Sequence, residues 1–195
     1  MGGVVSVRPV DRVVELLREG LRGRAPLRQD IPDFRPAAIL VPLVDRGGEP
    51  HLVFTLRSAE LSTHSGQVSF PGGKVDAEDA DHVAAALREA EEEVGLSPAL
   101  VEVIGLLDEV VTPSGFVITP VVGFVAEGAV LRPSSPEVAE TFEVSLDALR
   151  APGVYEDMGD VERAGRTYRL VAYNVAGRNI WGATARVVHQ LLALS

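Results

Sequence analysis

The chain has 195 residues, of which 46% are hydrophobic, and its 18 Lys and Arg against 28 Asp and Glu give a net charge of −10. This size and composition suit one globular domain with a real core and exclude global disorder. The acidic balance argues against nucleic acid as a partner, and the absence of cysteine excludes disulfides, thiolate catalysis and cysteine-based zinc sites. The four histidines do not show the HExxH spacing of a zinc protease.

The sequence shows no targeting or membrane signal. The first residues, MGGVVSVRPV, lack a long apolar run after positive charges, so we expect no secretory signal. No stretch approaches the roughly 20 consecutive apolar residues that a membrane-spanning helix needs. The sequence therefore predicts a cytoplasmic protein without a membrane partner.

The predicted elements mix helices and strands along the whole chain. Apolar residues at helical spacing predict an N-terminal helix at about 10–24, followed by a proline-rich connector. Strands are expected, in chain order, at residues 37–45, 51–57, 67–70, 101–112, 116–127, 141–149 and 167–175, the sixth leading into a short helix. A further helix is expected at about 80–94 and a C-terminal helix at about 182–193. We interpret residues 1–195 as a single mixed α/β domain whose strands lie mostly in hairpins.

The helix predicted at about 80–94 concentrates negative charge. On a helical wheel at about 100° per residue, Glu89, Glu92 and Glu93 fall within one arc, separate from the apolar stripe. Glu91 lies outside this arc and is expected to be solvated. Arg88 precedes Glu92 by four residues, so it can pair with Glu92 or orient a neighbouring carboxylate.

A segment rich in glutamate is most often a surface helix whose charged face is solvated. Two glycines, Gly72 and Gly73, precede this helix, and their backbone can approach a ligand closely. Clustered carboxylates suit Mg²⁺ or Mn²⁺, which commonly bridge protein oxygens and substrate phosphates. A calcium EF-hand does not fit, because the position that requires glycine is Asp81.

These residues resemble the signature of the Nudix hydrolase family, G-x5-E-x7-R-E-U-x-E-E-x-G-U, where U is a bulky apolar residue. The run from Arg88 to Leu96, REAEEEVGL, matches its second half, with the small Ala90 at an apolar position. The first half departs from the pattern. Asp79 stands in place of the first glutamate, and eight residues rather than seven separate it from Arg88.

The segment FTLRSAELSTHSGQVSFPGGKVD, residues 54–76, is similar to the coenzyme A pyrophosphatase branch of the family. That branch carries a pattern like L-L-T-x-R-S-x3-R-x3-G-x3-F-P-G-G, and here Ser62 replaces its second arginine. The later segment NIWGATARV is also similar to that branch, although we assign Trp181 and Gly182 to packing. His64 is as compatible with a structural hydrogen bond as with a substrate contact.

The resemblance implies a Nudix-type fold, a mixed sheet sandwiched between helices, and a site that needs Mg²⁺ or Mn²⁺. It implies metal binding by Glu89, Glu92, Glu93 and the Gly73 carbonyl, with Arg88 orienting the carboxylates. The resemblance leaves two places open for the general base, the signature helix or a distant loop, and Glu137, followed by Glu140, is the loop candidate. The residues expected to bind substrate are Arg57, Ser58, Gly66, Gly72 and Lys74.

The activity implied is hydrolysis of the diphosphate of coenzyme A to 3′,5′-ADP and 4′-phosphopantetheine. Two alternatives stay open: hydrolysis of another nucleotide, such as ADP-ribose or a nucleoside triphosphate, and a Nudix module that senses a nucleotide without cleaving it. The expected partner is a small-molecule substrate, and a homodimer is compatible with the sequence.

Overall fold

The computed structural model describes residues 7–60 and 66–195. Ser62 and His64, considered above, lie outside the described residues. The helices are α1 (Pro9–Leu21), α2 (His82–Val94), α3 (Leu146–Arg150) and α4 (Gly182–Leu192), with a 3-10 turn, η1, at Pro98–Leu100. No helix in these described ranges is long and apolar enough to cross a membrane.

The larger sheet has eight strands and is mixed. Its strands are β1 (Arg35–Arg46), β2 (Glu49–Arg57), β3 (Val68–Ser69), β4 (Gly72–Lys74), β5 (Val101–Leu106), β6 (Val110–Val111), β7 (Phe116–Val125) and β8 (Val138–Ser145). The main order is β3-β2-β1-β7-β5, with β4 paired to β1, β6 to β7 and β8 to β2. The strands β1 and β2 form the predicted hairpin, but β1 and β7 run parallel.

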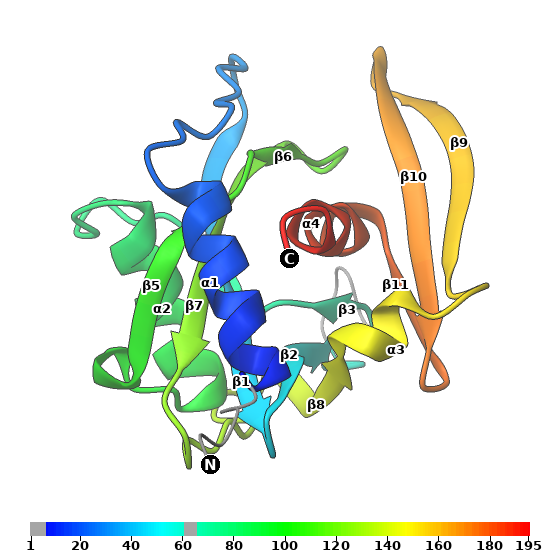
Figure 1. Cartoon of the computed structure of the whole chain (residues 1–195). Helices are drawn as coiled ribbons and strands as arrows, with labels where there is room; N and C mark the ends of the chain where they lie inside the picture. The colour runs from blue at the N-terminus through cyan, green and yellow to red at the C-terminus, as the bar shows by residue number, and fades with distance from the viewer. Residues whose placement is uncertain (1–6, 61–65) are drawn as a thin grey trace, which may run out of the picture.

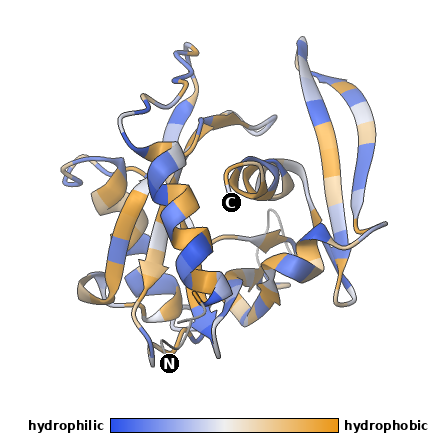
Figure 2. Cartoon of the chain, viewed as in Figure 1, coloured by the Kyte–Doolittle hydropathy of each residue, from blue (hydrophilic) through white to orange (hydrophobic). Residues whose placement is uncertain are grey.

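The core follows from the alternation of side chains along β1. Val41 and Leu43 belong to the apolar cluster that includes α1, whereas Leu40 and Val44 belong to the cluster that includes α2. Successive side chains of a strand point to opposite faces, so a strand that is apolar on both faces has to be covered on both. Figure 1 shows α1 and α2 beside this sheet, and Figure 2 shows the apolar and polar bands along α1. The sandwich of helices around a mixed sheet is thus confirmed.

A second, antiparallel sheet contains β9 (Tyr155–Arg163), β10 (Arg166–Val175) and β11 (Arg178–Trp181) in the order β11-β10-β9. Figure 1 shows α4 lying between the long β9–β10 hairpin and the larger sheet. Val187, Val188 and Leu191 of α4 are buried in the same apolar cluster as α1. The helix therefore joins the two sheets.

The structure differs from the expected strands. The strands β4, β9 and β11 were not predicted, because they are short or rich in glycine and charged residues. The strand expected at 101–112 divides into β5 and β6, since Asp108 and Glu109 accept hydrogen bonds from the backbone N–H groups of Leu27 and Gln29 in the connector. The prediction that strands lie mostly in hairpins is wrong for the central pair β1 and β7, which needs a long crossover.

Candidate active site

Helix α2 is fixed at both ends by local chemistry. The Asp81 side chain accepts a hydrogen bond from Ala84 N at 2.8 Å, which satisfies a free N–H of the first turn. Gly95 ends the helix in the left-handed conformation, at φ 67°, with its N–H turned back to the carbonyls of the last turn. Ala86 and Ala90 are fully buried against the sheet, so one turn of glutamates is held beside β4.

Glu93 is the one buried glutamate of this turn, with 7% of its surface exposed. Its Oε2 accepts a hydrogen bond from Gly72 N at 3.1 Å. Burial raises the pKa of Glu93 to about 7, with the hydrogen bond from Gly72 opposing the shift and the charge of Glu89 adding to it. A buried carboxylate next to a second negative charge can bind a cation, because the cation would favour the ionised form of the carboxylate.

Glu89 lies against Gly73 of β4. A Cβ atom added to Gly73 would lie 2.5 Å from Glu89 Oε1, so the carboxylate occupies the space that only glycine leaves open. The Glu89 side chain is 18% exposed, and burial raises its pKa as well. The carboxylates of Glu89 and Glu93 thus approach the same glycine turn from one face of α2.

Arg88 holds this face in place. Its Nε and one terminal nitrogen donate to the two oxygens of Asp79 at 3.0 and 2.9 Å, and its other terminal nitrogen donates to Glu89 at 3.0 Å. The same side chain reaches the Lys74 carbonyl at 3.2 Å and lies 3.5 Å from Glu92. Such two-pronged pairing fixes orientation as well as charge. Asp79, which departs from the family pattern, is therefore the anchor of Arg88.

A cavity of about 980 Å³ opens beside these residues. The sequence-predicted residues that line it are Arg57, Gly72, Gly73, Lys74, Glu89, Glu93 and Glu137. These positions lie on β2, β4, α2 and the loop before β8, so elements distant in sequence build one site. Its volume is at the upper end for a small-molecule pocket, which suits a large nucleotide.

Four predicted site residues do not line the cavity: Arg88, which acts from behind Glu89, and Glu92, Ser58 and Gly66. The Glu92 side chain is 59% exposed, because α2 turns it outward beyond Arg88. Ser58 Oγ accepts a hydrogen bond from Glu60 N at 3.4 Å, and Gly66 takes a left-handed conformation at φ 68° and donates to the Arg57 carbonyl. Gly66 therefore has a local role in the β2–β3 connection, whereas Ser58 also donates its backbone N–H to the Glu137 carbonyl at 2.8 Å and so ties β2 to the loop before β8.

Arg57 and Glu137 pair with each other in the lining of the cavity. A terminal nitrogen of Arg57 lies 3.2 Å from Glu137 Oε2, and the Glu137 side chain is 52% exposed. Arg57 Nε is buried without a hydrogen-bond partner among the described residues. An unpaired buried donor is costly, and an anionic oxygen in the cavity would satisfy it. Glu140 instead pairs with Arg178 at 2.7 Å, which leaves Glu137 as the loop glutamate of the cavity.

The donor set fits a divalent cation in part. Glu89 and Glu93 supply carboxylate oxygens at one turn, which is the chemistry that Mg²⁺ and Mn²⁺ take. Among residues 7–60 and 66–195, no three His, Asp or Glu side chains converge closely enough to form a complete ligand set by themselves. Mg²⁺ commonly keeps water and substrate oxygens in its coordination shell, so two protein carboxylates are consistent with it.

The opposite wall of the cavity was missed from the sequence. Trp181, Gly182, Ala183 and Thr184 line it, together with residues of the β9–β10 hairpin and Arg186. Trp181 is 43% exposed and lines the cavity, so its surroundings include this space as well as packed side chains. The similarity of NIWGATARV to the family's later segments was the signal that pointed here. Phe116, beneath the Arg35 guanidinium at 4.1 Å, also lines the cavity.

Comparison with known proteins gives the family of the chain. The NUDIX domain family matches residues 33–164, more than half of the chain. A Citrobacter koseri protein described as "Uncharacterized Nudix hydrolase NudL" is 44% identical over 157 residues, covering 80% of this chain and 81% of that protein. Its Escherichia coli K12 counterpart, with the same description, is 41% identical over 168 residues, covering 86% of each chain.

Among solved structures, a Nudix hydrolase from M. smegmatis, RenU, is 27% identical with a TM-score of 0.50. The alignment covers 61% of this chain and 78% of RenU. The family match spans β4 and α2, which carry the glycine turn and the paired glutamates. The chain therefore belongs to the Nudix family.

Proposed function

We propose that this Nudix hydrolase cleaves the diphosphate bond of coenzyme A and its derivatives, with 3′,5′-ADP and 4′-phosphopantetheine as products. The observation that carries the proposal is the placement of Glu89 and Glu93 in the same cavity as Arg57, whose Nε has no acceptor within residues 7–60 and 66–195. Carboxylates for a cation and a guanidinium for phosphate are the two parts that diphosphate hydrolysis requires.

Coenzyme A is preferred over other diphosphates for two reasons. The segment that resembles the coenzyme A branch, residues 54–76, contributes Arg57, Phe70, Gly72 and Gly73 to the cavity. The cavity of about 980 Å³ also has room for a substrate longer than a simple nucleotide. We further propose that α1 and α4 belong to the same domain as the sheet, because they share its apolar cluster.

In the reaction, a water oxygen bonds to one phosphorus while the bridging P–O bond breaks and the water loses a proton. A divalent cation, when bound, neutralises the diphosphate charge and lowers the pKa of water. Glu89 and Glu93 would hold this cation, with the Gly73 carbonyl beside them. Arg88 keeps Glu89 in position, and Arg57 binds a diphosphate oxygen.

Glu137 is the proposed acceptor of the water proton. It lines the cavity and pairs with Arg57, so substrate bound by Arg57 would lie beside it. A general base must lie within hydrogen-bond reach of the water, directly or through one further water. Glu92, turned toward solvent, is left with a supporting electrostatic role at the rim of the metal site.

The test is incubation of the purified protein with coenzyme A and Mg²⁺, with and without a chelator, and identification of the products by mass. We expect 3′,5′-ADP and 4′-phosphopantetheine only when the metal is available. Faster cleavage of ADP-ribose or a nucleoside triphosphate would replace coenzyme A as the substrate. Tight nucleotide binding with no products from any of them would favour the sensing module.

A further inference from the structure

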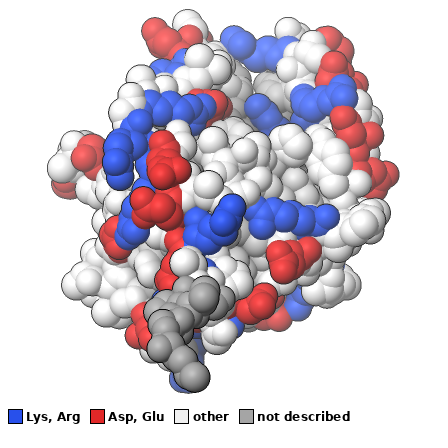
Figure 3. Space-filling view, in the orientation of Figure 1, with Lys and Arg blue, Asp and Glu red and all other residues white. Residues whose placement is uncertain are grey.

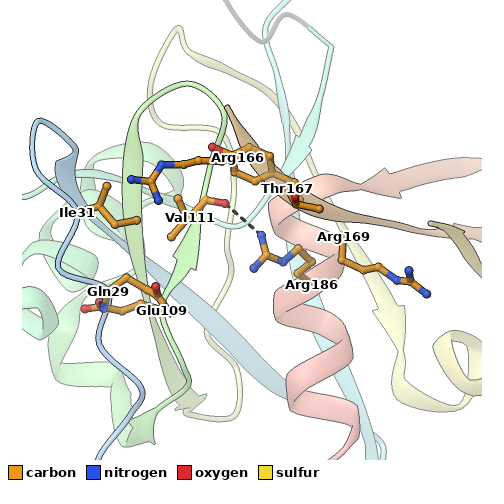
Figure 4. A pocket seen from close by; sticks show the side chains of 9 residues that line it. Gln29, Ile31, Glu109, Val111, Arg166, Thr167, Arg169 and Arg186 are labelled. Atoms are coloured by element: carbon orange, nitrogen blue, oxygen red, sulfur yellow. Dashed lines mark hydrogen bonds between the residues drawn. The ribbon is translucent and has the colours of Figure 1, made fainter. Parts of the chain in front are cut away.

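A second, smaller cavity of about 220 Å³ adjoins the candidate active site. It lies between the connector after α1, the strand β6, the β9–β10 hairpin and α4 (Figure 4). Its lining includes Arg166, Arg169 and Arg186. We call this cavity the arginine pocket. Arg169 and Arg186 also line the large cavity, so the two spaces share a wall.

Arg186 is a half-buried cation without an acidic partner among the described residues. A terminal nitrogen of Arg186 donates a hydrogen bond to the Val111 carbonyl at 3.1 Å, drawn in Figure 4. A guanidinium has five N–H donors, so most of its capacity is free for another acceptor. Burial lowers the pKa of Arg186, which shows that the surroundings disfavour an uncompensated charge.

Two further arginines lie on β10. Arg166 has no ion-pair partner in the described part of the chain, and its guanidinium lies 5.3 Å from the centre of the Phe34 ring. Arg169 pairs with Asp157 and Asp160, which anchor it to β9. Figure 3 shows basic side chains on the rim of a hollow near the top of the view.

The acidic residue of this pocket is already engaged. Glu109 accepts hydrogen bonds from Arg28 at 2.7 Å, from Thr119 at 3.1 Å and from Gln29 N at 2.6 Å. Burial alone would raise its pKa, but these three donors lower it, so the carboxylate stays ionised and paired. The pocket therefore keeps a local excess of positive charge in a chain whose net charge is −10.

We propose that the arginine pocket, through Arg166 and Arg186, binds a phosphomonoester of the substrate remote from the diphosphate that is cleaved. The inference rests on the proposed function, because the diphosphate has to lie at Glu89 and Glu93. Arginine forks suit phosphate oxygens, and the shared wall lets one molecule occupy both spaces. The 3′-phosphate of coenzyme A is such a group, whereas ADP-ribose has none.

The test compares coenzyme A with dephospho-coenzyme A, which lacks that phosphate, on Arg166→Gln and Arg186→Gln. We expect wild type to have the lower KM for coenzyme A. In each variant, the ratio of the coenzyme A KM to the dephospho-coenzyme A KM should rise about tenfold, as expected for loss of a charge-assisted hydrogen bond. Arg12→Gln on the exposed face of α1 is the matched control and should leave the ratio unchanged. Arg166 is exposed, so its variant tests the pocket even if Arg186→Gln unfolds.

A binding experiment separates this inference from the proposed function. Calorimetric titration with 3′,5′-ADP and with 5′-AMP needs no turnover, and wild type should prefer 3′,5′-ADP while both variants lose that preference. If wild type cleaves neither substrate but shows this preference, the proposed function fails and the phosphate pocket stands. Equal affinities in wild type, or KM ratios that the variants do not change, would overturn the pocket.

Discussion

Glu93 combines two properties that oppose each other, a charged function and burial. Its carboxylate is held by the N–H of Gly72 and lies near Glu89, while its exposed fraction is only 7%. Arg57 shows the reverse case, because its buried Nε has no acceptor in the part of the chain that the structure describes. Each group lacks a full set of partners among the described residues, and a ligand of opposite charge would complete each. The chemistry of the site therefore depends on a few single side chains.

Glu93→Gln keeps the shape of the side chain and removes its charge. We expect kcat with Mg²⁺ to fall by more than about 100-fold, because a ligand to the metal is lost. The thermal unfolding temperature should stay close to that of wild type, since the amide still accepts from Gly72. The matched control is Glu91→Gln on the exposed face of the same helix, and wild-type turnover in Glu93→Gln would remove Glu93 from the metal site.

Arg57→Ala tests substrate binding. We expect the KM for coenzyme A to rise by about tenfold or more, with a smaller change in kcat, because a charged hydrogen bond to the bound diphosphate is lost. Steady-state kinetics measure both constants. The opposite pattern, a large loss of kcat at constant KM, would assign Arg57 to the transition state instead.

The two glycines of the short strand β4 allow close contacts on different sides. Gly73 faces α2, where an added Cβ would meet Glu89, whereas an added Cβ on Gly72 would lie 2.4 Å from the Ala38 carbonyl oxygen. The first neighbour is the end of a flexible side chain and the second is backbone. The same small change therefore has different consequences at adjacent positions.

Gly73→Ala should reduce kcat/KM by about tenfold or more with little loss of stability, because it displaces the Glu89 carboxylate that we assign to the metal. Gly72→Ala should destabilise the fold by about 1–3 kcal/mol, since the β1–β4 pairing has to shift. Activity and chemical denaturation are measured on both variants. If Gly73→Ala were fully active, the close approach of Glu89 to β4 would have no catalytic purpose.

An ion pair between Asp79 and Arg88 joins the loop before α2 to the helix, and the Asp79 side chain is 5% exposed. Hydrogen bonds from Arg88 and from Asp76 N lower the pKa of Asp79. A carboxylate with a lowered pKa in the folded state stabilises the fold above its unfolded pKa, and this contribution is lost as the pH falls. The stabilisation by the Asp79–Arg88 ion pair should therefore weaken in acid.

Asp79→Asn measures this dependence. We expect it to lower the free energy of unfolding by about 1–3 kcal/mol at neutral pH. The difference from wild type should shrink as the pH falls below about 4, the usual pKa of Asp, because Asp79 is protonated first in the unfolded state and, below its lowered pKa, in both states. Denaturant unfolding at several pH values is the measurement, with Asp30→Asn at an exposed position of the connector as control. A difference that grows in acid would contradict the lowered pKa.

At the scale of the whole molecule, the cavity lies between parts of the chain that sequence reasoning treated separately. Helical spacing predicted that Glu89 and Glu93 share a face, and Gly72 and Gly73 were singled out before that helix. The outward turn of Glu92 could not be read from the wheel, because it depends on where β4 and Asp79 hold Arg88. The arginine pocket was not foreseen either, since β9 has a polar, charged sequence and its pairing with β10 is a tertiary outcome.

The parallel pairing of β1 with β7 has a consequence for how the chain folds. Arg35 lies opposite Phe116, so this central contact joins segments separated by α2 and several strands. Closing so long a loop costs entropy before any contact repays it, which makes parallel pairs slow to form. The turn that holds Glu93 is attached to β1, so we expect catalytic competence to appear late in refolding. Trp181, the single tryptophan of the chain, lines the cavity, and its emission in a stopped-flow experiment reports when that space closes.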